Sequence, residues 1–326
     1  MAEIYSHSRL SSFEDCPRKF QYRYVLKLPS ETEGIEAFVG KRVHEVLERL
    51  YRFTGDGKVP SLARVLERFQ LWWDEHFDAA RIRIVREGLD AEYYRRLGER
   101  CLTQYYRRNY PFDADETLAV EERVLFSLDP AGEYRLQGFV DRVVRARDGA
   151  LEIHDYKTSA RVPRQQWLDR DRQLALYQMG LSERYGRGKP VRLVWHYLAP
   201  NQVRTSTRTP EQLETLRADT IALIDRVRAE QEFKPKVGPL CSWCEFNDIC
   251  EASPVRRARP RAQEPAVSVE ASAAAGEEPA TPREEPATPG QEPATPREDP
   301  ATPREAVPGE APAASPPAGG GQLSLL

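Results

Sequence analysis

Residues 138–157, GFVDRVVRARDGALEIHDYK, constrain the fold more than any other segment of the chain. Two runs rich in β-branched residues flank Asp148-Gly149, a dipeptide typical of hairpin turns, so the segment predicts two antiparallel strands. If the loop has three residues, with Gly149 in the left-handed conformation, Ala146 pairs with Ala150. A strict two-residue turn would shift this register by one residue and turn one strand over.

Two acids and a lysine stand on this hairpin. On the second strand Leu151, Ile153, Asp155 and Lys157 share one face, because side chains alternate with a period of two. In the three-residue register Asp141 lies opposite Asp155, with Cβ atoms ~5 Å apart. Carboxylates that close repel each other, and a bound cation is the ordinary remedy. A solvated surface hairpin would show the same letters, so these residues alone leave both interpretations open.

The composition changes at about residue 251. The tail is rich in Pro, Ala, Glu and Thr, and it cannot bury enough apolar surface to offset the entropy of ordering. We therefore expect residues 256–321 to be a disordered linker. The tail carries 7 basic and 12 acidic residues, while the preceding body carries 41 and 39, so the net charge of −3 does not argue against a polyanionic partner. The motif Pro-Ala-Thr-Pro begins at Pro279, Pro286, Pro293 and Pro300.

No signal peptide opens the chain and no apolar run approaches the ~20 residues of a membrane span, so we expect a cytoplasmic protein without membrane contact.

In such a protein the five cysteines indicate metal binding rather than disulfides. Three thiols form Cys241-x2-Cys244-x5-Cys250, and Cys16 stands far upstream. Four thiolates could hold zinc or an iron–sulfur cluster, and the spacing does not choose between them. Cys101 lies in a helical stretch and is predicted to be an ordinary buried thiol.

The remaining periodicities predict an α/β body. Residues 37–53 have a helical apolar stripe with His44 beside it, and residues 61–109 are also helical. Residues 117–128 alternate as a strand whose Glu122, an acid in an apolar row, is a further candidate for the site. Later elements are a helix at about 170–185, a strand at 190–198, a possible strand at 203–208 and a helix at 211–231.

The order of the motifs resembles the RecB-like branch of the PD-(D/E)XK nucleases, and most closely its iron–sulfur members, which include the AddB nuclease domain and the CRISPR adaptation nucleases. The resemblance depends on His44 after a glycine, Asp141 in GFVDRV, Asp155-Tyr156-Lys157, and Gln173-x3-Tyr177, with one early and three late cysteines around them. It covers about residues 4–255. It implies a mixed central β-sheet flanked by helices in a domain spanning 1–255, in which 54–116 is a helical insertion.

The resemblance also implies roles for individual residues. His44, Asp141, Asp155 and the Tyr156 carbonyl would bind Mg²⁺ or Mn²⁺, and Lys157 would orient the attacking water. Gln173 and Tyr177 would position the lysine or the DNA strand. The four thiols that would bind a 4Fe–4S cluster are Cys16, Cys241, Cys244 and Cys250. Carboxylate oxygens suit hard cations, and such an ion can both activate water and stabilise charge on a phosphate.

We therefore expect a metal-dependent DNA nuclease, an exonuclease of repair or recombination. A non-cleaving iron–sulfur DNA-binding scaffold and a CRISPR spacer-processing nuclease are the alternatives. The chain has no G-x4-G-K-[ST] motif, so any helicase would be a separate partner. The end of the chain is similar to the peptides that bind the bacterial sliding clamp, and its clamp-binding residues would be Gln322, Leu323, Leu325 and Leu326.

Overall fold

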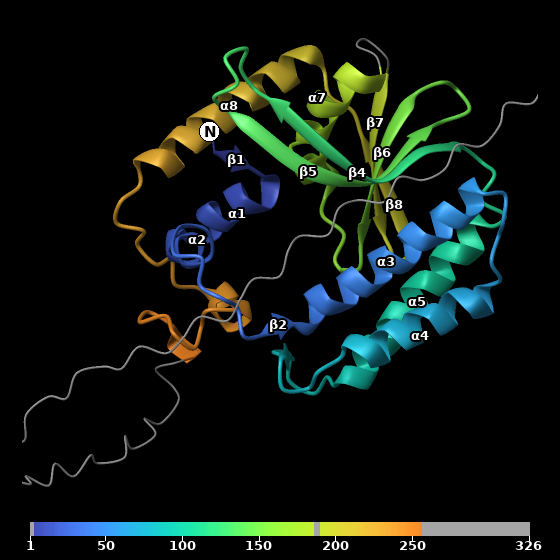
Figure 1. Ribbon diagram of the computed structural model, residues 1–326, viewed down its shortest axis with the longest axis horizontal. Helices are drawn as coiled ribbons and strands as arrows, with labels where there is room; N and C mark the ends of the chain where they lie inside the picture. The colour runs from blue at the N-terminus through green and yellow to red at the C-terminus, as the bar shows by residue number, and fades with distance from the viewer. Residues whose placement is uncertain (1–2, 186–189, 256–326) are drawn as a thin grey trace, which may run out of the picture. The chain divides into compact units, whose positions relative to one another are not determined.

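A mixed β-sheet lies at the centre of the structure, a computed structural model that describes residues 3–185 and 190–255 (Figure 1). Its strands are β1 (Ile4–Tyr5), β4 (Glu116–Ser127), β5 (Arg135–Arg145), β6 (Leu151–Lys157), β7 (Val191–Tyr197) and β8 (Gln202–Ser206). They are ordered β1-β5-β6-β7-β8, and β4 pairs with β5 as well. β6 is antiparallel to β5 but parallel to β7, which confirms the predicted mixed sheet.

Helices surround this sheet, largely where periodicity predicts them. The predicted helix at 37–53 is part of the longer α3, and the predicted helical region at 61–109 is two helices, α4 and α5, separated by the short strand β3. β3 (Ile82–Arg83) pairs with β2 (Glu33–Gly34) in a separate parallel ladder. The helices are α1 (His7–Asp15), α2 (Pro17–Phe20), the π-helical η1 (Gln21–Val25), α3 (Ile35–Gly55), α4 (Leu62–His76), α5 (Ala91–Asn109), α6 (Gln165–Leu168), α7 (Gln173–Tyr185), α8 (Pro210–Ala229) and the 3₁₀ turn η2 (Pro239–Trp243).

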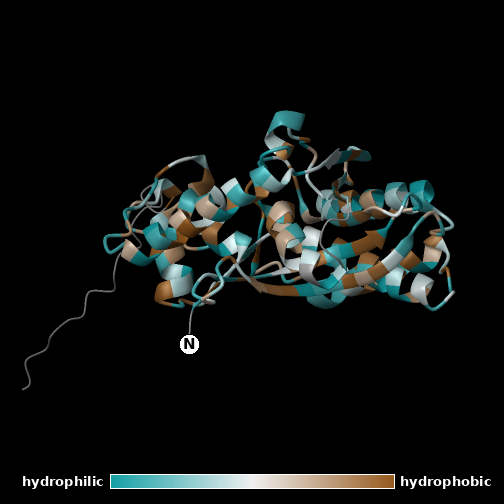
Figure 2. Ribbon diagram, turned by 90° about the horizontal axis from the view of Figure 1, so that it is seen from above, coloured by the Kyte–Doolittle hydropathy of each residue, from teal (hydrophilic) through white to brown (hydrophobic). Residues whose placement is uncertain are grey.

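Apolar side chains divide into three buried clusters, and two of them hold the sheet between helices. α3, α4 and α5 pack together and against one face of the sheet, where Tyr156 is buried among them. α7 packs on the other face against Val124, Val140 and Ile153. α1 and α8 enclose the third cluster beside the start of β5. Figure 2 shows the hydrophobic residues of the strands between more polar helix surfaces, as burial of one helix face requires.

The β5–β6 hairpin has the register predicted for a three-residue loop. Arg142 pairs with His154 and Arg145 with Leu151. The Ala146 N–H donates to the Ala150 carbonyl, and Gly149 has a φ of +84°, which glycine adopts without steric cost. The turn chemistry therefore set the pairing of the hairpin up to Arg142 and His154. The ladder ends there, so the predicted pairing of Asp141 with Asp155 is not formed.

The parallel β6–β7 pair requires a crossover, and residues 158–190 supply it. This crossover contains α7, so α7 returns across the sheet beside the end of β6. Among the described residues, no helix is long and apolar enough to cross a membrane. The predicted linker at 256–321 and the predicted clamp peptide at 322–326 lie outside the described residues.

Candidate functional site

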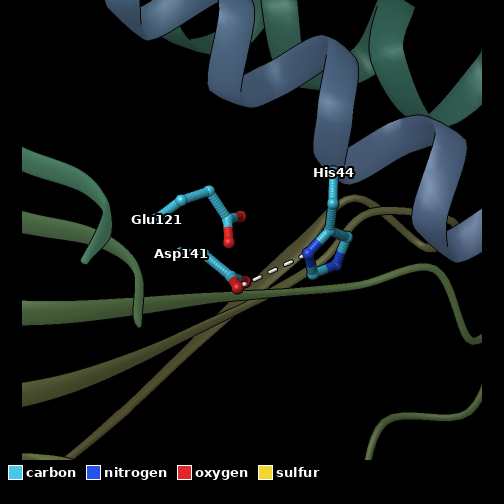
Figure 3. Close-up of side chains that lie close together, drawn as sticks. All are labelled: His44, Glu121 and Asp141. Atoms are coloured by element: carbon cyan, nitrogen blue, oxygen red, sulfur yellow. Dashed lines mark ion pairs between the residues drawn. The ribbon is translucent and has the colours of Figure 1, made fainter. Parts of the chain in front are cut away.

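Three side chains from three elements meet at the junction of α3 with the sheet. His44 comes from α3, Glu121 from β4 and Asp141 from β5, and their ligand atoms all lie within 4.8 Å of one another. Figure 3 shows the two carboxylates turned toward the imidazole. His44 Nδ1 is 3.4 Å from Asp141 Oδ1. The group offers one nitrogen and two carboxylates, a donor set that suits a divalent cation such as Mn²⁺ or Mg²⁺.

Hydrogen bonds fix the orientation of the His44 ring. His44 Nε2 is 2.7 Å from the Tyr156 carbonyl oxygen, and because a carbonyl only accepts, Nε2 is the donor. In the neutral ring Nδ1 then carries the lone pair, and Nδ1 faces Asp141. A histidine that binds a metal commonly donates its second N–H to a backbone carbonyl in this way. The imidazole is thus held with its free nitrogen toward the carboxylates.

Glu121 is the residue that sequence reasoning missed, and the choice of Glu122 was wrong. Glu122 forms an ion pair with Arg184 of α7, on the opposite side of β4. Glu121 has a φ of +49°, and the β4–β5 ladder has no rung between Glu121 and Asp141. Because neighbouring side chains of a strand point to opposite faces, Glu121 faces His44 of α3 while Glu122 faces α7. The sequence pattern does not show which of these two faces carries the site.

Asp155 lies outside the close group of His44, Glu121 and Asp141 but borders it. Its carboxylate is buried and contacts Lys157, whose Nζ is 2.9 Å from Oδ1 and 2.8 Å from Oδ2. Both carboxylate oxygens thus lie within ion-pair distance of the ammonium, which compensates for the burial of their charge.

The backbone of Tyr156 connects the two aspartates. The β5–β6 ladder ends at the Arg142–His154 pair, and the Tyr156 N–H instead donates to Asp141 Oδ2 at 2.7 Å. The strands thus separate where the acids stand, and the Asp141 side chain takes the hydrogen bond that a strand carbonyl would otherwise accept. The Tyr156 carbonyl already accepts from His44, so its role as a metal ligand stays a prediction.

The charges of the site perturb one another strongly. Burial lowers the pKa of His44, but Asp141 and Asp155 more than compensate and raise it to about 9. Burial and the charge of Asp141 raise the pKa of Glu121 to about 7. Burial also raises the pKa of Asp155 to about 6, against the opposing effect of Lys157. The site thus has an excess of negative charge that protons relieve in the absence of a metal.

Gln173 and Tyr177 lie one turn apart at the start of α7. Gln173 accepts from Lys157 Nζ at 3.1 Å and donates from its amide to Asp155 Oδ1 at 3.2 Å, so it contacts both members of the pair. The Tyr177 ring packs against β5 at Gly138, where an added Cβ would lie 2.1 Å from Tyr177 Cε1. The close approach of the Tyr177 ring therefore explains why the GFVD motif has a glycine at position 138.

A buried polar network supports the strands behind the site, and the sequence did not reveal it. The Tyr156 hydroxyl is 3.1 Å from that of Tyr105, and Arg142 stacks 4.0 Å over the Tyr51 ring. Arg142 Nη2 donates to His154 Nδ1 at 2.9 Å. Burial, together with this guanidinium, holds the pKa of His154 well below its usual range, so the ring stays neutral and accepts. The network positions the Tyr156 backbone that contacts Asp141 and His44.

The four predicted cluster-binding cysteines line one cavity of about 110 Å³, although Cys16 is more than 200 residues from the other three in the sequence. The Lys236 N–H points at Cys16 Sγ at 3.4 Å, and the Gly238 N–H points at Cys241 Sγ at 3.5 Å. Within the described ranges, no three of the sulfurs all lie within 4.8 Å of one another. The cysteines of this cavity are Cys16, Cys241, Cys244 and Cys250.

The fifth cysteine is separate from that cavity. Cys101 is fully buried in the hydrophobic cluster of α3, α4 and α5, as predicted for an ordinary thiol. Burial raises its pKa to about 12, so it stays a neutral thiol at neutral pH.

Comparison with known proteins finds one family and a number of solved structures, among them the following two. The sequence profile described as the PD-(D/E)XK nuclease superfamily matches residues 4–251. Among curated proteins none matches the chain. A "Putative exonuclease" from Eubacterium rectale is 14% identical with a TM-score of 0.46, over 79% of this chain and 89% of that chain. The structure of SSO0001 is 18% identical with a TM-score of 0.29, over 73% and 95%.

Proposed function

The chain belongs to the PD-(D/E)XK nuclease superfamily, and we propose that it is a metal-dependent deoxyribonuclease acting as an exonuclease in DNA repair or recombination. The observation that carries this proposal is the group of His44, Glu121 and Asp141 beside the buried Asp155–Lys157 pair. Phosphodiester hydrolysis needs an activated water and a charge that stabilises the phosphate in the transition state. A carboxylate-rich site next to an ammonium group meets both needs.

The residues of the site fit a divalent cation. His44 Nδ1, Glu121, Asp141 and Asp155 Oδ2 would hold it, with the Tyr156 carbonyl as a further oxygen. The hydrogen bond that His44 Nε2 donates to the Tyr156 carbonyl supports this assignment, because it leaves Nδ1 turned toward Asp141. Bound Mg²⁺ or Mn²⁺ would lower the pKa of a water and neutralise charge on the phosphate.

The remaining residues would orient the reacting groups and assist proton transfer. Lys157 would hold the attacking water and the departing oxygen within reach of its ammonium group. Gln173 contacts both Lys157 and Asp155, so it would fix the orientation of this ion pair. Tyr177 packs on Gly138 and would fix the position of the α7 turn that carries Gln173.

The test is cleavage of end-labelled DNA with Mg²⁺ or Mn²⁺ by wild type, Asp155→Asn and Asp219→Asn. Asp219 is an exposed acid on α8 and serves as the matched control. We expect Asp155→Asn to lose at least a hundredfold in rate, since the site loses a ligand charge, and Asp219→Asn to cleave like wild type. An Asp155→Asn protein as active as wild type would refute the proposal. A wild type that binds DNA without cleaving would instead support the non-catalytic scaffold.

For the cysteine cavity we propose a 4Fe–4S cluster held by Cys16, Cys241, Cys244 and Cys250. Four thiolates on one zinc ion would lie ~3.8 Å apart, as Zn–S bonds of ~2.3 Å in a tetrahedron require. The choice of iron over zinc rests on the resemblance to the iron–sulfur nucleases, and in a 4Fe–4S cluster each thiolate would bind a different iron. The two N–H groups that point at sulfur support thiolate charge.

The cluster is tested by visible absorption and iron content of anaerobically purified protein. Cys244→Ser should lose both, whereas Cys101→Ser should keep both because Cys101 lies in the separate hydrophobic cluster. Stoichiometric zinc and no iron in the wild type would contradict the assignment.

Two partners are proposed from the sequence alone. The terminal residues Gln322–Leu326 would bind the bacterial sliding clamp through a short apolar peptide on a long tether. A pull-down with purified clamp would test this, and equal capture of the full chain and of a chain ending at 321 would dispose of it. Any helicase that unwinds the substrate would be a separate protein.

A further inference from the structure

An exposed strip of the sheet begins beside the proposed metal site. On β4 and β5, Arg123 is directly opposite Phe139, and Leu125 is directly opposite Gln137. We call these four residues the sheet strip. Phe139 and Asp141 are two positions apart on β5, so their side chains share a face. The strip therefore starts next to a proposed metal ligand and leads away from it along the sheet.

The apolar side chains of the strip face solvent. Phe139 is 54% exposed and Leu125 46% exposed. The alternating residues Val124 and Val140 are buried against α7 on the opposite face, so this part of β4 and β5 is covered on one side only. An exposed aromatic ring and an exposed leucine side by side next to a functional centre mark a contact surface for a ligand.

The strip also offers a cation. Arg123 is exposed, and its Nη2 donates to Gln137 Oε1 at 3.1 Å. In the part of the chain that the structure describes, no carboxylate forms an ion pair with Arg123. A guanidinium that lies opposite an exposed aromatic residue and has no acidic partner is suited to a phosphate.

We propose that the sheet strip binds the unpaired nucleotides that adjoin the cut phosphate, with a base stacked on Phe139 and a phosphate on Arg123. This inference rests on the proposed nuclease function and assigns its substrate class as a single-stranded end. Two residues of a strand advance ~6.6 Å, so a base on Phe139 would belong to a nucleotide next to the one at Asp141.

Stacking explains why the strand must be unpaired. Exposed aromatic residues on a β-sheet stack on the bases of single strands in other nucleic-acid-binding folds, and such stacking tolerates any sequence. In a duplex both faces of every internal base are already stacked on neighbours. A duplex would therefore have no base face to offer to Phe139 until its end had separated.

Binding without cleavage tests this directly. Fluorescence anisotropy of a labelled oligothymidylate in EDTA would compare full-length wild type with Phe139→Ala, Phe139→Trp and Arg123→Gln. Tyr93→Ala is the matched control, because Tyr93 is a partly exposed aromatic residue on α5, outside the strip. Loss of one stack should weaken binding about 5- to 100-fold in Phe139→Ala, while Phe139→Trp should bind within about twofold of wild type. Arg123→Gln should reduce the salt slope of log K by about 0.7.

The outcomes separate the strip from the nuclease proposal. Phe139→Ala with wild-type affinity for the single strand would refute the strip, whether or not the wild type cleaves DNA. The same holds if Phe139→Ala changes only the oligomeric state, which would make the strip a contact between copies of this chain. If Phe139→Ala loses single-strand binding, keeps its melting temperature and still binds blunt duplex as wild type does, the strip is supported. That result would stand even if no variant cleaves DNA.

Discussion

Replacing Glu121 with glutamine tests the electrostatics of the proposed metal site. The Glu121 carboxyl ionises at about 7 in the folded protein, against an ordinary value of 4.5, because burial and Asp141 raise its pKa. The folded state therefore holds an extra proton between these pH values, and its stability falls as the pH rises through this window. The penalty is absent below about pH 4.5 and complete above about pH 7.

The size of this penalty follows from the shift. A rise from 4.5 to about 7 corresponds to about 3 kcal/mol at 1.36 kcal/mol per pKa unit. Glu121 is only half-buried, so solvent screening reduces this to about 1–2 kcal/mol. Without metal at pH 8, Glu121→Gln should accordingly be more stable than wild type by about 1–2 kcal/mol, or a few degrees in Tm for a domain of this size.

Bound metal should make the wild type more stable than Glu121→Gln. A cation that binds the folded state stabilises it by about 2.7 kcal/mol at a hundred times its Kd, and the glutamine variant has lost one ligand charge. Thermal melts in EDTA at pH 8 and pH 5, and with Mn²⁺ at pH 8, would measure these effects. Wild type should melt above Glu121→Gln only with Mn²⁺, and the two should converge in EDTA at pH 5. A variant that melts below wild type in EDTA at pH 8 would refute the reasoning.

Two further substitutions have outcomes that follow from contacts in the site. Gly138→Ala places a Cβ 2.1 Å from Tyr177 Cε1 and should lower the free energy of unfolding in urea by about 1–3 kcal/mol. Gly55→Ala, where the added Cβ has free space, should leave it unchanged. Recovery of stability in a Gly138→Ala, Tyr177→Leu double variant would identify the clash as the cause. Lys157→Gln leaves the buried Asp155 carboxylate without its cation, so the free energy of unfolding in EDTA at pH 8 should fall by about 3 kcal/mol. At pH 5 the loss should be smaller, because Asp155, whose pKa is raised to about 6, is then protonated. An equal loss at both pH values would contradict this origin.

Local patterns were sufficient for most secondary structure and for the position of the β5–β6 turn. They left the length of its loop open, and the structure has the three-residue loop that ends at Gly149 and the register that follows from it. The α3 stripe predicted its helix, because both the apolar spacing and the helix period are local. Placing His44 next to Asp141 required more than local patterns, and only the order of motifs in a known family suggested it.

The site itself was predicted in part. His44 and Asp141 do meet, and Gln173 contacts both Lys157 and Asp155. Glu121 was missed, because the alternation along β4 does not show which face of the strand lies toward His44. The metal roles of these residues, and the cluster role of the cysteines, stay predictions until metal content and activity are measured.

Sequence alone determined where the chain turns, which residues alternate on each strand and which segment cannot form a core, because these properties depend on neighbours within a few positions. Tertiary structure decided which acids converge. α3 packs on one face of the sheet and α7 on the other, and α3 brings His44 to Glu121 and Asp141. These contacts join distant segments of the chain, and no local pattern records them.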